Sequence, residues 1–145
     1  MIPKLVSIGA IWRVLPPGIH EATLDDVAYS FATNARRKIL YDGLVKGCQA
    51  LKVAGCSTVY LDGSYITEKL YPRDFDVCWD PTGVNPAKLD PVLLDFSNKR
   101  RNQKMKYGGE FFPSSAKADG SRTFIDFFQT DRESGNEKGI IRIRL

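Results

Sequence analysis

The sequence predicts an α/β (α+β) domain, in which a small mixed β-sheet carries helices mainly on one face. A long run over 34–54 has apolar residues at helical spacing. Two short runs rich in strand-forming residues, 58–62 and 75–79, follow it. The chain has 145 residues, which suits a single domain with its own hydrophobic core. These observations together predict one domain over 1–145.

The N-terminal part of the chain predicts little regular structure before its first helix. Residues 1–22 read as an irregular lead-in, because two prolines and a glycine at 16–18 interrupt it. Thr23 or Asp25 can cap a short helix that runs to Phe31. Within this lead-in, residues 8–15 can form a short strand or an extended arm.

The second helix carries both end signals and an unusual basic start. Thr33 or Asn34 can cap its N-terminus, and Gly55 can end it in a left-handed conformation. The Arg-Arg-Lys run at 36–38 opposes the helix dipole, which favours anions at this end. A solvent-facing cluster is the simpler interpretation, and contact with phosphate or a partner is the alternative.

The strand over 75–79 places two carboxylates on one side. Side chains alternate along a strand, so Asp74 and Asp76 point one way, and Phe75 and Val77 point the other way. Two converging carboxylates attract a hard divalent cation such as Mg²⁺ or Mn²⁺ and leave coordination positions open for phosphate. This strand therefore predicts a metal site.

A Gly-Ser turn follows the preceding strand. Gly63 has no β-carbon to obstruct an approaching group, and Ser64 adds a hydroxyl to the backbone N–H groups of the turn. Such a turn can bind phosphate. The sequence thus places a candidate phosphate-binding turn shortly before a candidate metal-binding strand.

The combination resembles the signature of the DNA polymerase β-like nucleotidyltransferase superfamily, in which a Gly-Ser turn precedes an Asp-x-Asp strand. Here Gly63 and Ser64 are followed, after nine residues, by Asp74 and Asp76. The wider run Tyr60–Asp80 is similar to a small, poorly characterised bacterial group of minimal nucleotidyltransferase-like proteins. The resemblance implies a minimal nucleotidyltransferase fold. It also implies transfer of a nucleoside monophosphate from a nucleoside triphosphate, such as ATP, with Gly63 and Ser64 gripping the triphosphate.

The same resemblance implies metal-binding and catalytic roles for three carboxylates. Asp74 and Asp76 would bridge two Mg²⁺ or Mn²⁺ ions. The third carboxylate would bind the metal near the acceptor and help to deprotonate its hydroxyl. Asp126 matches that role best, and Glu110 is the runner-up.

The expected role of Asp126 depends on a predicted strand over 123–128. This run is Thr-Phe-Ile-Asp-Phe-Phe, and an aspartate inside an aromatic strand is costly to bury unless it is paired or bound to a metal. A solvent-facing edge position is the alternative. A last strand is expected over 139–145, with Arg142 and Arg144 on one face.

A strongly basic segment precedes this region. Residues 97–106, the end of a predicted helical stretch, supply Lys99, Arg100 and Lys104 as candidate contacts for nucleotide phosphates. The aromatic loop at 107–113 can stack a base. A solvated helix face beside ordinary core aromatics is the alternative, and no motif decides between the two.

Composition limits the class of protein. The net charge is +4, yet residues 56–95 hold 3 basic against 7 acidic side chains, and residues 96–145 hold 11 against 6. Three cysteines without a close pair, and a single histidine, argue against a disulfide scaffold and a zinc site. Neither a signal-peptide pattern nor an apolar run of membrane-spanning length is present in the sequence. A cytoplasmic location without a membrane partner is therefore expected.

The chain has little room for a second region that binds an acceptor. An RNA (such as tRNA) or protein acceptor is expected, and an antitoxin or regulatory protein is an expected partner, because small members of the superfamily resemble parts of toxin–antitoxin or defence modules. Two other functions stay open. One is a non-catalytic regulatory or binding module with this fold. The other is a two-metal phosphodiesterase or nuclease, although such an enzyme does not need a triphosphate-binding turn.

Overall fold

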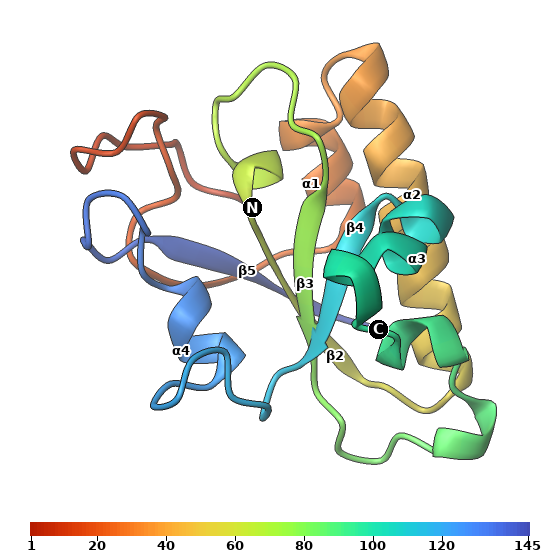
Figure 1. Ribbon diagram of the computed structural model, residues 1–145. Coiled ribbons are helices and arrows are strands. Elements are labelled where there is room, and N and C mark those ends of the chain that lie inside the picture. Colours follow the sequence, from red (N-terminus) through yellow and green to blue (C-terminus); the bar gives the residue numbers. More distant parts are fainter.

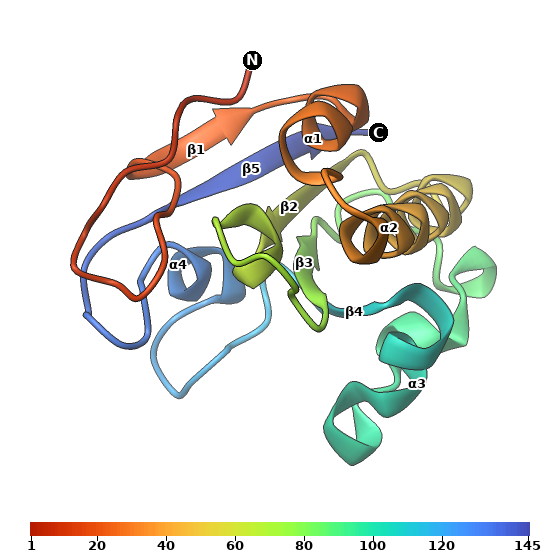
Figure 2. The same ribbon diagram turned by 90° about the horizontal axis from the view of Figure 1, so that it is seen from above.

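The computed structural model describes residues 1–145, which form a five-stranded mixed sheet with helices on both faces (Figures 1 and 2). The strand order is β1-β5-β2-β3-β4. The strands are β1 (Gly18–Glu21), β2 (Thr58–Asp62), β3 (Phe75–Trp79), β4 (Gly109–Pro113) and β5 (Gly139–Arg144). The helices are α1 (Leu24–Phe31), α2 (Ala35–Val53), α3 (Ser97–Tyr107) and α4 (Phe124–Phe128). The predicted small mixed sheet is confirmed.

The sheet combines parallel and antiparallel pairs. Strand β2 runs antiparallel to both β3 and β5, whereas β1 is parallel to β5 and β4 is parallel to β3. The antiparallel pair β2–β3 is joined by a short connection that contains the 3₁₀ turn η1 (Ser64–Ile66). The end of β2 and the start of β3 therefore lie side by side, which brings the Gly-Ser turn next to the acidic strand.

The predicted helix ends are confirmed for α1 and α2. Thr23 caps α1 in a capping box with Asp26, in which each side chain accepts a hydrogen bond from the other residue's backbone N–H. The Asn34 side chain caps α2 by accepting a hydrogen bond from the backbone N–H of Arg37. Gly55 follows α2 with a φ of +98°, as the helix-ending signal predicted.

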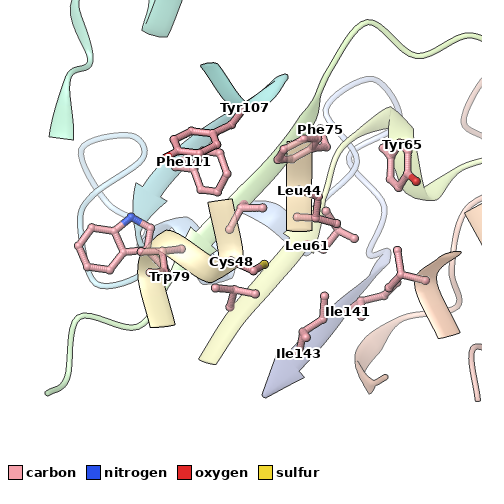
Figure 3. Close-up of a cluster of buried hydrophobic side chains, with 14 of the residues drawn as sticks. Leu44, Cys48, Leu61, Tyr65, Phe75, Trp79, Tyr107, Phe111, Ile141 and Ile143 are labelled. Carbon is pink, nitrogen blue, oxygen red and sulfur yellow. The ribbon is translucent and has the colours of Figure 1, made fainter. Parts of the chain in front are cut away.

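The main core lies between α2 and one face of the sheet (Figure 3). The alternation predicted for β3 is confirmed, because Phe75, Val77 and Trp79 are all buried in this core. From α2, Leu44 and Cys48 reach the same cluster. An apolar face behind β3 therefore fixes the strand that carries the predicted carboxylates.

The opposite face of the sheet is covered by α4 (Figure 2). Cys78, Phe128 and Ile140 form a small buried cluster on this face. Beside it, the rings of Phe112 and Phe124 stack with centroids 4.2 Å apart. This second face holds the polar cavity described below.

The expected strand over 123–128 is instead the helix α4. Phe124, Phe127 and Phe128 recur at the i, i+3, i+4 spacing of a helix, and all three line one cavity on the sheet. A short run of Phe, Ile and Thr has the composition of a strand, so composition alone did not reveal the helical period.

Two strands were not predicted. Strand β1 lies within residues 1–22, which are therefore not wholly irregular, and it starts directly after the prolines as an edge strand. Strand β4 occupies the expected aromatic loop at 107–113 and pairs in parallel with β3. The expected final strand is confirmed as β5, and its Arg142 and Arg144 both pair with Glu21. None of the helices has the length and apolar character needed to cross a membrane.

A buried arginine organises the connection between β2 and β3. The Arg37 side chain donates hydrogen bonds to the backbone carbonyl oxygens of Phe31, Tyr65, Thr67 and Lys69, at 2.6 Å for Tyr65 and 2.8 Å for Thr67. The guanidinium also lies 5.3 Å from the centroid of the Tyr65 ring. Three of the four carbonyl groups belong to the segment between the Gly-Ser turn and β3, so α2 holds this segment in place.

The expectation that residues 36–38 face solvent is thus wrong for Arg37, which is only 3% exposed. Arg36 is exposed but donates hydrogen bonds to the carbonyl oxygens of Pro72 and Arg73. The basic run at the start of α2 thus supports the loop together with the apolar packing of Tyr65 and Ile66 in the main core. Its charge is offset by carbonyl oxygens instead of by an anion at the helix end.

We expect Arg37→Ala to lower the free energy of unfolding by about 3 kcal/mol, because several buried carbonyl groups lose their donor, at about 1 kcal/mol each. Urea unfolding followed by circular dichroism measures the change. Lys38→Ala, at the exposed neighbouring position, is the matched control and should change stability by less than about 0.5 kcal/mol. Equal effects of the two substitutions would contradict the proposed support.

Candidate functional site

Three carboxylates lie in a row across three neighbouring strands. Asp62 on β2 is the cross-strand partner of Asp76 on β3, and Asp76 is the partner of Glu110 on β4. All three line a cavity of about 470 Å³, together with Gly63 and Ser64. The sheet therefore gathers acidic side chains at one register position, directly beside the Gly-Ser turn.

The turn reaches this position because residue 63 is glycine. Its φ is +91°, which disfavours any residue with a side chain. A β-carbon there would also lie only 2.9 Å from the Asp76 carboxylate oxygen Oδ2 and 3.2 Å from the Asp76 backbone nitrogen. The backbone conformation and the close approach each require glycine at position 63, and the close approach shows that the turn packs directly against Asp76.

The two outer carboxylates of the row are paired with basic side chains. Lys138 Nζ lies 2.5 Å from Asp62 Oδ1, and both side chains are mostly buried. Arg100 and Lys104 lie 3.3 Å and 3.0 Å from Glu110 Oε1. Asp76, between them, makes no salt bridge. The central carboxylate is thus the one whose charge is not offset by a contact within the protein.

The pKa values reflect this crowding. Burial, followed by the neighbouring charges of Asp62, Glu110 and Asp74, raises the pKa of Asp76 to about 8. Burial also raises the pKa of Asp62, although Lys138 opposes the shift. The pKa of Asp74 is raised by burial and by the charge of Glu110. A cation bound among these acids would favour their ionised forms, so metal binding here would release a proton.

Asp74 stands slightly apart from the row. It precedes β3 and lines a separate groove between α2 and α3, together with Arg73 and Lys104. Its charge nevertheless acts on Asp76, and the charge of Glu110 acts on it in turn. The sequence predicted that Asp74 and Asp76 point the same way, but the two side chains line different hollows, because Asp74 lies before β3 and outside its alternation.

Asp126 does not join the carboxylates, so its expected role as the third carboxylate is not supported by the fold. It lies on the helix α4, is exposed, and accepts a hydrogen bond from the Thr123 hydroxyl at 3.2 Å. It lines a different cavity, beside Pro17 and Gly18. The runner-up, Glu110, takes the place beside Asp76, because the segment that carries it is a strand.

The three basic residues expected to contact phosphates occupy different places. Arg100 lines the carboxylate cavity, and its guanidinium carbon lies 5.6 Å from the Phe112 ring centroid. Lys104 binds Glu110 but lines the groove on the Asp74 side. Lys99 lines a third hollow on the outer side of α3. Only Arg100 is thus placed directly in the cavity of the Gly-Ser turn.

Sequence reasoning missed two residues of the site. Asp62 directly precedes Gly63, and the alternation of β2 could have placed it on the same face as Asp76. Lys138 lies 76 positions further along the chain, just before β5, and no local pattern connects it with Asp62. Its pairing follows from the antiparallel contact of β2 with β5.

The donor set has the chemistry that Mg²⁺ or Mn²⁺ prefers, because Asp62, Asp76 and Glu110 supply carboxylate oxygens. No group of three or more His, Cys, Asp or Glu side chains is arranged to hold a metal ion by itself. Mg²⁺ is commonly bound by one or two carboxylates together with substrate phosphates, so a complete protein cage is not required. Asp76, with Asp74 or Asp62, fits such a partial site.

A protein-family model matches residues 11–144, which is nearly the whole chain. The chain belongs to the family of unknown function DUF6932. No curated protein and no solved structure matches it. The matched region of this DUF6932 chain includes Asp62, Asp76 and Glu110, together with the Gly63-Ser64 turn.

The raised pKa of Asp76 predicts a pH-dependent stability. The folded protein holds a proton on Asp76 that the unfolded chain releases near pH 4, so stability falls as pH rises from about 4 through 8, by at most about 1.4 kcal/mol per pH unit. Asp76→Asn should remove this contribution and raise the midpoint of thermal unfolding at pH 9 relative to the wild type.

The thermal unfolding of both proteins at pH 5 and pH 9 measures this effect. The exposed Asp126→Asn is the matched control and should leave the pH dependence as it is. If the difference in unfolding midpoint between the wild type and Asp76→Asn is the same at pH 5 and at pH 9, Asp76 ionises normally and the prediction is wrong.

Proposed function

We propose that this protein is a metal-dependent nucleotidyltransferase, which with Mg²⁺ or Mn²⁺ moves a nucleoside monophosphate from a nucleoside triphosphate to an acceptor hydroxyl and releases pyrophosphate. The observation that carries the proposal is the packing of the Gly63-Ser64 turn against Asp76. This contact joins a phosphate-binding turn to an unpaired, crowded carboxylate in one cavity.

In this proposal Asp76 holds the metal, and the second carboxylate is either Asp74, which lines the adjoining groove, or Asp62, the cross-strand partner of Asp76. Asp76 has no basic partner within the protein, so its carboxylate is available to a cation, and Asp74 is close enough to influence its ionisation. Bound metal ions would stabilise the negative charge that develops on the attacking and leaving oxygens of an in-line displacement. A cation would also oppose the burial and the neighbouring negative charges that raise the pKa of Asp76.

The triphosphate would lie along the Gly63-Ser64 turn. Ser64 lines the cavity, and Arg100 and Lys138 line it as well. Each of these two cations is bound to a carboxylate, and each has a remaining donor capacity that phosphate oxygens can take up. The turn would therefore meet the phosphates on one side, and the two basic side chains would flank them.

The base would pack on the aromatic part of the same cavity. Phe112, Phe124 and Phe127 line it, on the side formed by β4 and α4. Aromatic faces bind nucleobases by stacking with little dependence on sequence. This wall supports a nucleotide as the ligand over inorganic phosphate alone.

Glu110 is proposed as the third carboxylate in place of Asp126. It is the cross-strand neighbour of Asp76, and Arg100 and Lys104 hold its Oε1 atom. In this position it can accept the proton of an acceptor hydroxyl that approaches from the Asp74 side. The acceptor is an RNA, such as tRNA, or a protein.

One observation favours a second candidate, a non-catalytic nucleotide-binding module. Lys138 and the pair of Arg100 and Lys104 already offset the charges of two of the three carboxylates. A module that retained the cavity without metal chemistry would keep such pairs. The two candidates differ in whether bound nucleotide is transferred.

The purified protein is to be incubated with each α-³²P-labelled nucleoside triphosphate, Mg²⁺ or Mn²⁺, and total RNA or cell lysate. We expect the wild type to transfer label, and Asp76→Asn and Glu110→Gln each to lower the rate by about 100-fold or more, as is typical for groups that act on the transition-state charge or the proton. Asp126→Asn, the matched carboxylate outside the cavity, should retain the wild-type rate.

The outcomes separate the candidates. Nucleotide binding by calorimetry without any transfer would support the non-catalytic module. Hydrolysis of an RNA or DNA phosphodiester without transfer would support a two-metal phosphodiesterase or nuclease. Loss of transfer in Asp126→Asn, with a retained rate in Glu110→Gln, would overturn the assignment of the third carboxylate.

A further inference from the structure

We propose that the groove between α2 and α3 binds the sugar–phosphate backbone of a nucleic acid acceptor. The groove has a volume of about 600 Å³ and lies apart from the carboxylate cavity. Five basic residues line it, against two acidic ones. The basic residues are Arg36, Lys46, Arg73, Lys104 and Lys106, and the acidic ones are Asp42 and Asp74.

The charge of this groove is only partly offset. Lys46 and Arg73 are exposed and form no ion pair. Lys104 and Lys106 pair with Glu110 and Asp90. The groove therefore presents free positive charge, which attracts a polyanion and makes its binding sensitive to salt.

The helix α3 extends the basic surface beyond the groove. Its sequence from 97 to 107 contains no acidic residue. Lys99 and Arg101 are exposed, form no ion pair, and line an adjoining hollow. Lys104 lines both the hollow and the groove, so the two are contiguous. A continuous basic strip of this kind suits a chain of phosphates better than a single small anion.

An unusual backbone turn places these charges. Asn98, Lys99 and Arg100 have positive φ values of 50°, 56° and 61°, a left-handed conformation that costs about 1–2 kcal/mol per residue without glycine. The turn brings Arg100 into the carboxylate cavity, whereas Lys99 and Arg101 line the outer hollow. Backbone strain of this kind persists where the surrounding structure fixes it.

The groove also has the shape and the apolar surface for a nucleotide chain. Gly43 on α2 lines the groove, and its lack of a side chain lets the carbonyl oxygen of Tyr107 at the end of α3 approach α2 closely. Ile39 and Met105 line it and remain 63% and 72% exposed. Sugars and bases can cover these apolar side chains while the phosphates meet the basic ones.

Asp74 connects the groove with the proposed reaction. It lines the groove, and its charge acts on Asp76 in the neighbouring cavity. Lys104, which lines the same groove, contacts Glu110. A strand bound in the groove would therefore end with a hydroxyl near Asp74 and Glu110. This step rests on the proposed function, whereas binding of the strand does not require catalysis.

Fluorescence anisotropy tests the groove with a labelled single strand of about 20 nucleotides, as RNA and as DNA of the same sequence, over a range of KCl concentrations. We expect Lys46→Gln with Arg73→Gln, and Lys99→Gln with Arg101→Gln, each to weaken binding about 10-fold at low salt. Each pair of substitutions removes two phosphate contacts. The negative slope of log K against log[KCl] should therefore become shallower by about 1.4. Lys4→Gln with Lys52→Gln removes the same charge from two exposed lysines elsewhere and is the matched control.

Equal effects of the control and groove variants, or no binding of either strand, would overturn the inference. If the transfer assay labels only protein and the anisotropy assay detects no strand binding, the inference is also wrong, and the acceptor is a protein. Tighter binding of RNA than of DNA would support the groove and identify RNA as the acceptor. Similar binding of both would support recognition of the backbone alone. If strand binding depends on the groove residues but no nucleotidyl transfer occurs, the proposed function is wrong and the inference about the groove still holds.

Discussion

The buried Arg37 guanidinium is the interaction on which the rest of the site depends. The connection from the Gly63-Ser64 turn to β3 contains little regular structure, and Arg37 on α2 donates hydrogen bonds to three of its carbonyl groups. A charged donor in such a place must be fully hydrogen-bonded, and here the backbone supplies the acceptors. The helix thereby fixes the turn against Asp76, and the turn in turn requires glycine at position 63.

The second constraint is an excess of negative charge on one face of the sheet. Register brings Asp62, Asp76 and Glu110 side by side, and basic residues from distant segments offset the two outer carboxylates only. The basic residues of α3 have two different surroundings. Arg100 and Lys104 pair with Glu110, whereas Lys99 and Arg101 line the outer hollow and form no ion pair. The acidic middle and basic last third of the sequence thus become adjoining surfaces of one molecule.

Local patterns predicted the elements whose signals are complete within a short stretch. The caps at Thr23 and Asn34, and the alternation of β3, lie in the sequence itself and were found there. Asp126 was misplaced because five residues of strand-like composition form a helix. The partners of Lys138 and Arg37 follow from contacts between distant elements, which no local pattern encodes. The strand β4, and with it the position of Glu110, likewise depends on pairing with β3.

The most direct test of the central claim is a crystal structure with Mn²⁺ and a non-hydrolysable nucleoside triphosphate, in which anomalous scattering locates the metal. The account predicts an anomalous peak at the Asp76 carboxylate, with the phosphates along the Gly63-Ser64 turn and Glu110 beside them. A peak at Asp126, or a nucleotide bound outside the cavity of Asp62, Asp76 and Glu110, would contradict it.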